Sequence, residues 1–393
     1  MPHGISKHKN KINCLDGLRG LAVILVILFH LYGHRRREYG TVVDRVLRNF
    51  WFGYCGVNLF LVLSGFCLTL SLLRKDAAGK PLGLGSFFKG RAWRIVPPYY
   101  ASILLYLAVP LAWRILEGRA SNDLTTWQLA THASFLHGYD EETLFAICVS
   151  YWSLSLEMQF YLALPLLYEL ARRRGCWPVL MFVAAISLGW NLWARSIAPG
   201  SLALRWGIFP GRWTEFALGM AVAFWYERSG WKGASATRVS SALSALFLAL
   251  ALGVGYTEGH IDPISLNYLY GAGFAMLLMA TLSSGIRGGR LARMLEWPWI
   301  VRAGEMSYSL YLTHVLIQGK TSKLCSLLVP NPNPAAEIGL VLANLAAIFA
   351  GGWLFYVLVE RHFQRSVGTK RESASTRVKV LDASRSLVPA ARH

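Results

Sequence analysis

Apolar stretches long enough to cross a lipid bilayer recur along the whole chain. They lie near residues 18–33, 50–73, 96–116, 152–170, 178–194, 206–227, 239–256, 264–283, 299–319 and 336–360. A spanning helix needs about 20 residues, each adding about 1.5 Å to its length. Backbone polar groups in lipid must find partners within the protein, so we expect these stretches to be helices. The pattern predicts an all-α polytopic membrane bundle of about ten transmembrane helices.

Three regions follow from the same pattern. Residues 1–11 form a short polar tail, residues 12–363 the transmembrane domain, and residues 364–393 a basic tail that we expect to be disordered. Within the domain, the stretch 117–150 is less apolar, and we expect it to hold a re-entrant or amphipathic segment.

Composition and charge agree with a membrane protein. Hydrophobic residues make up 54% of the chain and charged residues only 16%, which excludes a disordered chain. The net charge is +19, and 28 of the 40 lysines and arginines fall on one side if the N-terminus is cytoplasmic. This bias follows the positive-inside rule, so we expect both termini in the cytoplasm and no nucleic-acid partner. The run Arg35–Arg37 is the exception; it suggests at most a contact with an anionic substrate or headgroup.

The cysteines give no framework for a disulfide or a metal. The chain has six, several of them inside apolar stretches, and no CxxC pair occurs. We therefore expect buried thiols and no metal site.

The first apolar stretch carries an acid, a base and an imidazole. Asp16 and Arg19 are three residues apart, so they share one side of a helix. Arg19 and His30 are eleven apart, so they differ by only about 20° around the axis and lie about 16 Å apart along it. Polar groups in a span usually face the bundle interior and mark function. Two plainer interpretations stay open: an interfacial ion pair at Asp16–Arg19, and an inert histidine near the headgroups.

Two further arginines are expected at the depth of Arg19. Arg91 and Arg94 stand in "SFFKGRAWRIVPPYY" on one helical face, at the inner end of the third span. Three guanidinium groups at one level suit a phosphate-bearing ligand, because their planar forks bind phosphate oxygens in pairs. A positively charged flank that contacts lipid headgroups is the alternative.

A carboxylate lies inside the fourth span. Glu157 stands in "YWSLSLEMQFYLALPLL", expected in the outer half at about the depth of His30. A charge at that depth needs a partner. It would hold the imidazole of His30 in one tautomer. The alternative is a structural carboxylate bonded to neighbouring hydroxyl groups.

Two more stretches carry polar side chains. In "GEMSYSLYLTH", Ser307, Tyr311 and His314 share one helical face and would line an acceptor site, or else bond neighbouring helices. In "GVNLFLVLSGF", Asn58 and residues 64–65 are small or polar, which favours close helix packing.

These stretches, in this order, resemble the acyltransferase-3 family of integral-membrane acyltransferases. The resemblance covers about residues 12–363 and rests on five ordered motifs: "LDGLRGLAVILVILFH", "GVNLFLVLSGF", "RAWRIVPPYY", "WSLSLEMQFYLALPLL" and "GEMSYSLYLTH". One departure is Asn58, where the family more often has an acid.

The resemblance implies transfer of an acyl group, usually acetyl from acetyl-CoA, to a hydroxyl group. The acceptor would be a carbohydrate or lipid-linked glycan, such as O-antigen or exopolysaccharide, or a secondary metabolite such as a macrolide. The family's functional residues carry over to Arg19, His30, Arg91, Arg94 and Glu157. The resemblance also implies a multi-pass protein of a bacterial cytoplasmic (inner) membrane, in contact with the membrane lipid. Acceptor identity, acyl length, an acyl-enzyme and oligomeric state stay undetermined.

The residues and the resemblance join in one hypothesis. Acyl-CoA phosphates would bind Arg19, Arg91 and Arg94 at the cytoplasmic face. The thioester would then reach His30, which would act as general base or briefly hold the acyl group, with Glu157 orienting it. A proton-coupled transporter is the competing class, because intramembrane His and Glu also suit a proton relay. A flippase-like or purely structural membrane subunit is the third alternative.

Overall fold

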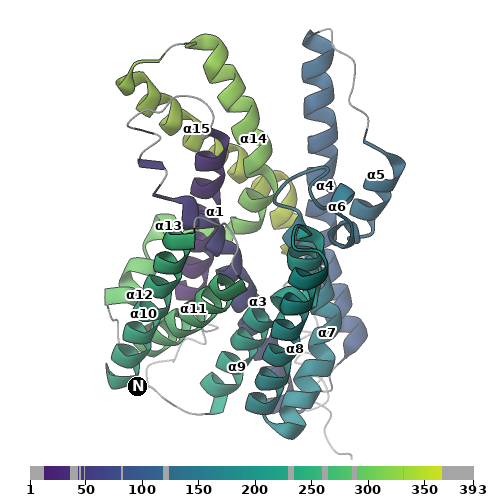
Figure 1. Cartoon of the computed structure of the whole chain (residues 1–393), viewed down its shortest axis with the longest axis vertical. Coiled ribbons are helices and arrows are strands. Elements are labelled where there is room, and N and C mark those ends of the chain that lie inside the picture. Colours follow the sequence, from purple (N-terminus) through teal and green to yellow (C-terminus); the bar gives the residue numbers. More distant parts are fainter. Residues whose placement is uncertain are drawn as a thin grey trace, which may run out of the picture.

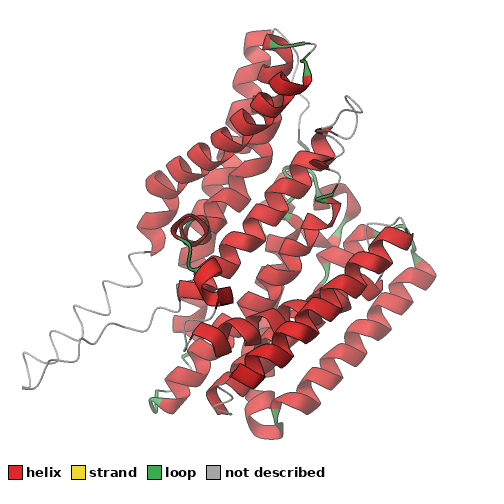
Figure 2. Ribbon diagram, turned by 90° about the vertical axis from the view of Figure 1, so that its left-hand side faces the viewer, coloured by secondary structure: helices red, strands yellow, loops and turns green. Residues whose placement is uncertain are grey.

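The computed structural model of the chain describes residues 13–35, 43, 46–47, 49–80, 83–117, 124–228, 234–258, 264–285, 290–330 and 332–364. The tail predicted at 1–11, nearly all of the tail predicted at 364–393, and the side chains of Arg35–Arg37 lie outside the described residues. Within the described ranges the secondary structure is helical, without strands (Figure 2), which confirms the all-α fold class.

Each predicted span overlaps a long helix of the described chain. These helices are α1 (Asn13–Arg35), α3 (Gly56–Ala77), α4 (Leu84–Glu117), α7 (Trp152–Arg174), α8 (Cys176–Ile197), α9 (Trp213–Arg228), α10 (Ala234–Glu258), α11 (Ile264–Gly285), α14 (Ser307–Leu328) and α15 (Pro334–Phe355). Seven segments of the described chain are long and apolar enough to cross a membrane. The chain is thus a multi-pass membrane protein, while the number of crossings and the side of the termini remain predictions.

Short helices connect or extend the long ones. They are η1 (Trp51–Cys55), α5 (Thr126–Ala133), η2 (His137–Tyr139), α6 (Glu141–Leu144), η3 (Ala203–Gly207), η4 (Phe209–Arg212), α12 (Arg290–Leu295), α13 (Pro298–Glu305) and η5 (Tyr356–Glu360). In α1, α3 and α11 most of the span residues are buried, whereas α4, α8, α10 and α15 lie at the periphery (Figure 1). Arg19 and His30 of the first span and Asn58 of the second are therefore on inner helices.

The predicted span at 299–319 is wrong in one respect, because the helix is broken. α13 ends at Glu305, Met306 leaves the helical conformation with φ −104° and ψ 17°, and α14 starts at Ser307. α13 packs so tightly on α1 that a Cβ at Gly304 would lie 1.7 Å from the carbonyl oxygen of Asp16. A hydropathy window averages across such a break, since both sides of it are apolar.

Glycines let α3 and α9 approach each other closely. A Cβ at Gly65 would lie 2.1 Å from the carbonyl oxygen of Phe216, and one at Gly219 would lie 2.0 Å from that of Val62. Small residues at helix crossings allow this backbone contact in membranes. The packing role predicted for Gly65 is confirmed.

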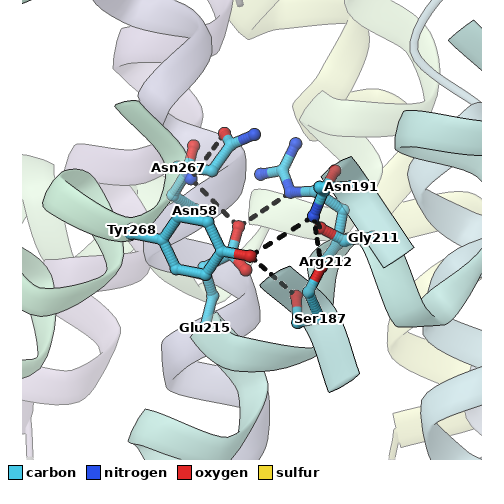
Figure 3. A network of polar contacts seen from close by, with 8 residues as sticks. All are labelled: Asn58, Ser187, Asn191, Gly211, Arg212, Glu215, Asn267 and Tyr268. Atoms are coloured by element: carbon cyan, nitrogen blue, oxygen red, sulfur yellow. Dashed lines mark hydrogen bonds and ion pairs between the residues drawn. The ribbon is translucent and has the colours of Figure 1, made fainter. Parts of the chain in front are cut away.

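A buried polar network joins α3, α8, α9 and α11 (Figure 3). The ion pair between Arg212 Nε and Glu215 Oε1 measures 2.7 Å, and the two side chains are only 4% and 1% exposed. Asn58 Nδ2 donates to Glu215 Oε1 and to Asn267 Oδ1, each at 3.2 Å. Polar side chains hold helices together in lipid in this way. Asn58 is thus a helix-joining residue, as its sequence context predicts.

The segment between α4 and α7 contains the short helices α5, η2 and α6, together with a stacked histidine pair. The rings of His132 and His137 are 4.1 Å apart at 8° to each other, and both are fully buried. Burial and the neighbouring His132 lower the pKa of His137 to about 4. The pair is therefore neutral near pH 7, so it packs without the cost of burying a charge.

Candidate active site

A cavity of about 140 Å³ lies between α1, α3, α4, α7 and α14. Aliphatic side chains and Phe60 form its apolar wall. Its polar wall is formed by Arg19, Ser64, Cys67, Arg91, Arg94, Ser153, Glu157, Tyr161, Ser307, Tyr308 and Tyr311. The five sequence motifs, which are spread over more than 290 residues, thus meet around one space.

The three predicted arginines all line this cavity. Arg19 donates from Nη1 to Asp16 Oδ1 at 2.8 Å and from Nη2 to Cys67 Sγ at 3.3 Å. The predicted Asp16–Arg19 pair is confirmed, and it holds Arg19 at the cavity wall rather than at the lipid surface. Arg91 and Arg94 reach the same space from α4, one helical turn apart. A cavity with three guanidinium groups suits an anionic ligand.

Glu157 also lines the cavity, but its partners differ from those expected. Its Oε1 accepts hydrogen bonds from Ser64 Oγ at 3.4 Å and from the hydroxyl of Tyr161, one helical turn further along α7. The predicted contact with His30 is not among the hydrogen bonds of the described residues. The reason is lateral placement: both residues lie within the bundle, but His30 pairs with a residue of α14 instead.

That partner is His314. His314 Nε2 lies 3.3 Å from His30 Nδ1, and the two rings meet edge to face with centroids 4.9 Å apart. His30 Nδ1 also lies 2.9 Å from the carbonyl oxygen of Val26, on the preceding turn of α1. His30 keeps some accessible surface, whereas His314 is 0% exposed. Of these two residues, only His30 has surface that a substrate could contact without a rearrangement.

Neither histidine is among the residues that line the cavity, whereas Tyr311 borders both the cavity and His314. The Tyr311 hydroxyl donates to the carbonyl oxygen of Ser150 at 2.6 Å and forms a second hydrogen bond with Ser153 Oγ, also at 2.6 Å. Its ring centroid is 5.9 Å from that of His314, while the same residue lines the cavity. Ser307, at the first turn of α14, also lines the cavity and is buried. Of the three residues predicted to bind the acceptor, two border the cavity and His314 lies behind them.

Sequence reasoning missed part of the cavity wall. Ser153 and Tyr161 flank Glu157 at intervals of four residues on α7, so the three share one helical face. That spacing is visible in the sequence and was the available signal. Cys67 and Tyr308 give no such signal, because a thiol or a phenol in an apolar span is usually a packing residue.

The sequence matches the protein family described as an acyltransferase domain over residues 12–358. It is 28% identical over 384 residues to the acyltransferase MdmB of Streptomyces mycarofaciens, covering 93% of this chain and 95% of that protein. It is 27% identical over 341 residues to a putative O-acetyltransferase of Staphylococcus aureus strain COL, covering 80% of this chain and 52% of that protein.

The O-acetyltransferase OatA of Staphylococcus aureus strain NCTC 8325 is 26% identical over 322 residues, which cover 76% of this chain and 49% of OatA. The chain thus spans about half the length of the staphylococcal relatives and nearly all of MdmB. No solved structure matches the chain.

Proposed function

The chain belongs to the acyltransferase-3 family, and from that premise we propose that it moves an acyl group, in the simplest case acetyl, from acyl-CoA to a hydroxyl group. The observation that carries the proposal is the gathering of Arg19, Arg91 and Arg94 around one cavity. Coenzyme A carries several phosphates and a long neutral arm, so it offers anionic groups to the guanidinium forks and a thioester at the far end.

His30 is the base of the proposed reaction. An imidazole nitrogen takes the proton of the acceptor hydroxyl while its oxygen attacks the thioester carbonyl. The C–S bond then breaks, and the thiolate takes the proton from the imidazolium, so no net proton is released. Arg19 and His30 lie on nearly one line of α1, about 16 Å apart along its axis. The acyl end of the donor would reach His30 past Tyr311, which forms the cavity wall on that side.

In this proposal Glu157 acts in the arginine-lined cavity that binds the donor, and it does not orient the imidazole of His30. Its carboxylate accepts from Ser64 and Tyr161 and shares the cavity with the arginines. There it fixes the Tyr161 hydroxyl and offsets part of the positive charge when no donor is bound. An anion that enters must compete with it, which favours a ligand with several negative charges.

The proposed acceptor is a hydroxyl of an envelope carbohydrate or lipid-linked glycan, which would approach from the outer face of a bacterial cytoplasmic membrane. Ser307 and Tyr311 border the cavity with hydroxyl groups that would contact it. A secreted secondary metabolite is the second acceptor class. The match to the acyltransferase MdmB, which covers 95% of that protein, supports acyl transfer as the reaction.

The test compares ester-linked acyl groups on the host's products. Cells that lack the protein, carry the wild type, or carry His30→Ala or His362→Ala are grown in parallel, and surface glycans and medium are analysed by mass spectrometry. His362 is an exposed histidine outside the cavity, so its variant is the matched control. Added acyl mass is expected with the wild type and His362→Ala alone. Identical profiles in all four cultures would overturn the proposal and favour a transporter.

A further inference from the structure

The contact between His30 and His314 fixes where the protons of both imidazoles lie. Nδ1 of His314 is 3.0 Å from the carbonyl oxygen of Leu310 and 2.9 Å from that of Tyr311. A carbonyl oxygen only accepts, so Nδ1 of His314 carries a proton and donates it. A neutral His314 then has a lone pair at Nε2. A second proton there would bury an unpaired charge in a fully buried side chain, which is costly.

The same reasoning applies to His30. Its Nδ1 faces the carbonyl oxygen of Val26 at 2.9 Å and Nε2 of His314 at 3.3 Å. Both are acceptors, so Nδ1 of His30 carries the proton and shares it between them. Nε2 of His30 is left without a proton. Among the described residues none forms a hydrogen bond with that nitrogen, and His30 keeps accessible surface.

This arrangement separates the roles of the two histidines. His314 is 0% exposed and uses both ring nitrogens on protein atoms, so it has nothing to offer a substrate. We propose that His314 is a positioning residue that, together with the Val26 carbonyl, holds His30 in the Nδ1–H tautomer with Nε2 free to act as the base. The proposal rests on the proposed function and gives His314 a different part from the acceptor contact expected from the sequence.

The partnership also acts during the reaction. When Nε2 of His30 takes the hydroxyl proton, the ring becomes an imidazolium and its Nδ1–H becomes a stronger donor. Val26 and His314 already accept from that group, so they stabilise the cation without reorganisation. A carboxylate does this in other base-assisted transfers. A neutral imidazole places no negative charge beside His30 and repels no anionic donor.

The surrounding contacts hold the pair in place. Gln318, one turn beyond His314 on α14, donates from Nε2 to the carbonyl oxygen of His30 at 2.8 Å. The backbone N–H of Leu316 donates to the hydroxyl of Tyr106 on α4 at 3.0 Å. The Gln318 hydrogen bond thus joins α1 and α14, the two helices that carry the imidazoles, one turn beyond His314.

The kinetic test uses three variants of the full chain in lipid nanodiscs, with acetyl-CoA and the acceptor found in the ester analysis. His314→Leu removes the acceptor atom, and His314→Gln keeps an amide oxygen for His30 and an amide N–H for the carbonyls. His132→Leu is the matched control, because His132 is also fully buried with Nδ1 2.9 Å from the carbonyl four residues earlier. Thermal unfolding is measured for all three.

We expect His314→Leu to lower kcat at least about 10-fold while KM for the donor changes less than about 2-fold. His314→Gln should recover most of the wild-type kcat. His132→Leu should keep the wild-type kcat, although it loses about as much thermal stability as His314→Leu. A purely structural role would lower activity in both leucine variants alike. If His314→Leu keeps the kcat of the wild type while His30→Ala loses it, the proposal is overturned and the proposed function stands.

A second readout does not depend on turnover. Spectra of ¹⁵N-histidine-labelled protein report which ring nitrogen carries the proton, and the His30 signals are assigned by their loss in His30→Gln. The proposal predicts Nδ1–H for His30 in the wild type and a mixture of tautomers in His314→Leu. Nε2–H in the wild type overturns it. A wild type that transfers no acyl group would overturn the proposed function and the catalytic purpose of His314 with it.

Discussion

Nε2 of His314 lies 3.3 Å from Nδ1 of His30, although 284 residues separate the two in the sequence. The contact joins the first helix of the bundle to the last but one. It places the proposed base beside a buried neutral acceptor instead of beside a carboxylate. Arg19, Arg91 and Arg94 line a cavity that Tyr311 borders as well.

The arginine cavity predicts a specific dependence on the donor's phosphates. Arg91→Gln should raise KM for acetyl-CoA by roughly 10- to 100-fold, the value of one charge-assisted hydrogen bond of about 1.5–3 kcal/mol. Acetyl-pantetheine lacks the nucleotide phosphates, so its transfer should respond much less to the same substitution. Steady-state kinetics with both donors measure this difference. An equal loss with both donors would show that Arg91 acts on the fold or the thioester instead.

Glu157→Gln separates the two roles considered for this carboxylate. The amide keeps an acceptor for Ser64 and Tyr161 but removes a negative charge from the arginine cavity. We expect KM for acyl-CoA to equal that of the wild type or to fall below it, and kcat to change less than about 10-fold. If the carboxylate orients His30, its removal should instead lower kcat by about 10²-fold or more. Steady-state rates of purified protein decide between these outcomes.

The crossing of α3 and α9 predicts a sharp difference between two glycines. Gly65→Ala places a Cβ 2.1 Å from the carbonyl oxygen of Phe216, so the helix backbones must separate. Gly189→Ala in α8 meets nothing within 4 Å and gains helix propensity of about 1 kcal/mol. Thermal unfolding in detergent should show a clear drop in Tm for the first and none for the second. Equal Tm values would contradict the close packing.

The stacked pair His132–His137 predicts a loss of stability in acid. The pKa of His137 is about 4 in the folded protein, against about 6.5 for an ordinary histidine, so the unfolded chain binds the proton more readily. Its contribution is fully present above about pH 6.5 and is lost as the pH falls toward 4. The Tm of the wild type should drop between pH 7 and pH 5. His137→Gln should flatten that slope, and an unchanged slope would contradict the prediction.

Much of the proposed donor site is predictable from the sequence. Depth along a span follows from residue count, so the sequence places Arg19, Arg91 and Arg94 at one level. The turn of 100° per residue places Ser307 and Tyr311 on one face. Both inferences need only one helix at a time, and the structure gathers all five residues at one cavity.

The pairing of His30 could not be predicted in the same way. Equal depth made Glu157 a plausible partner, but depth does not say which helices are neighbours. α14 packs against α1, whereas α7 adjoins α3 and α8. The break at Met306 gives no signal in the apolar pattern either, and neither does the close contact of the neighbouring Gly304 with α1. Lateral order in a bundle is a property of several helices together, and apolar patterns do not encode it.

The most direct test of the account follows the acyl carbon itself. Purified wild type and His30→Ala, each in nanodiscs at equal amounts and with equal Tm, are mixed with [1-¹⁴C]acetyl-CoA and extracted glycan or metabolite acceptor. Label in the ester and free CoA thiol are measured together. The account predicts one thiol released for each ester formed by the wild type, and a rate at least about 10²-fold lower for His30→Ala. Equal ester formation by both proteins would contradict it.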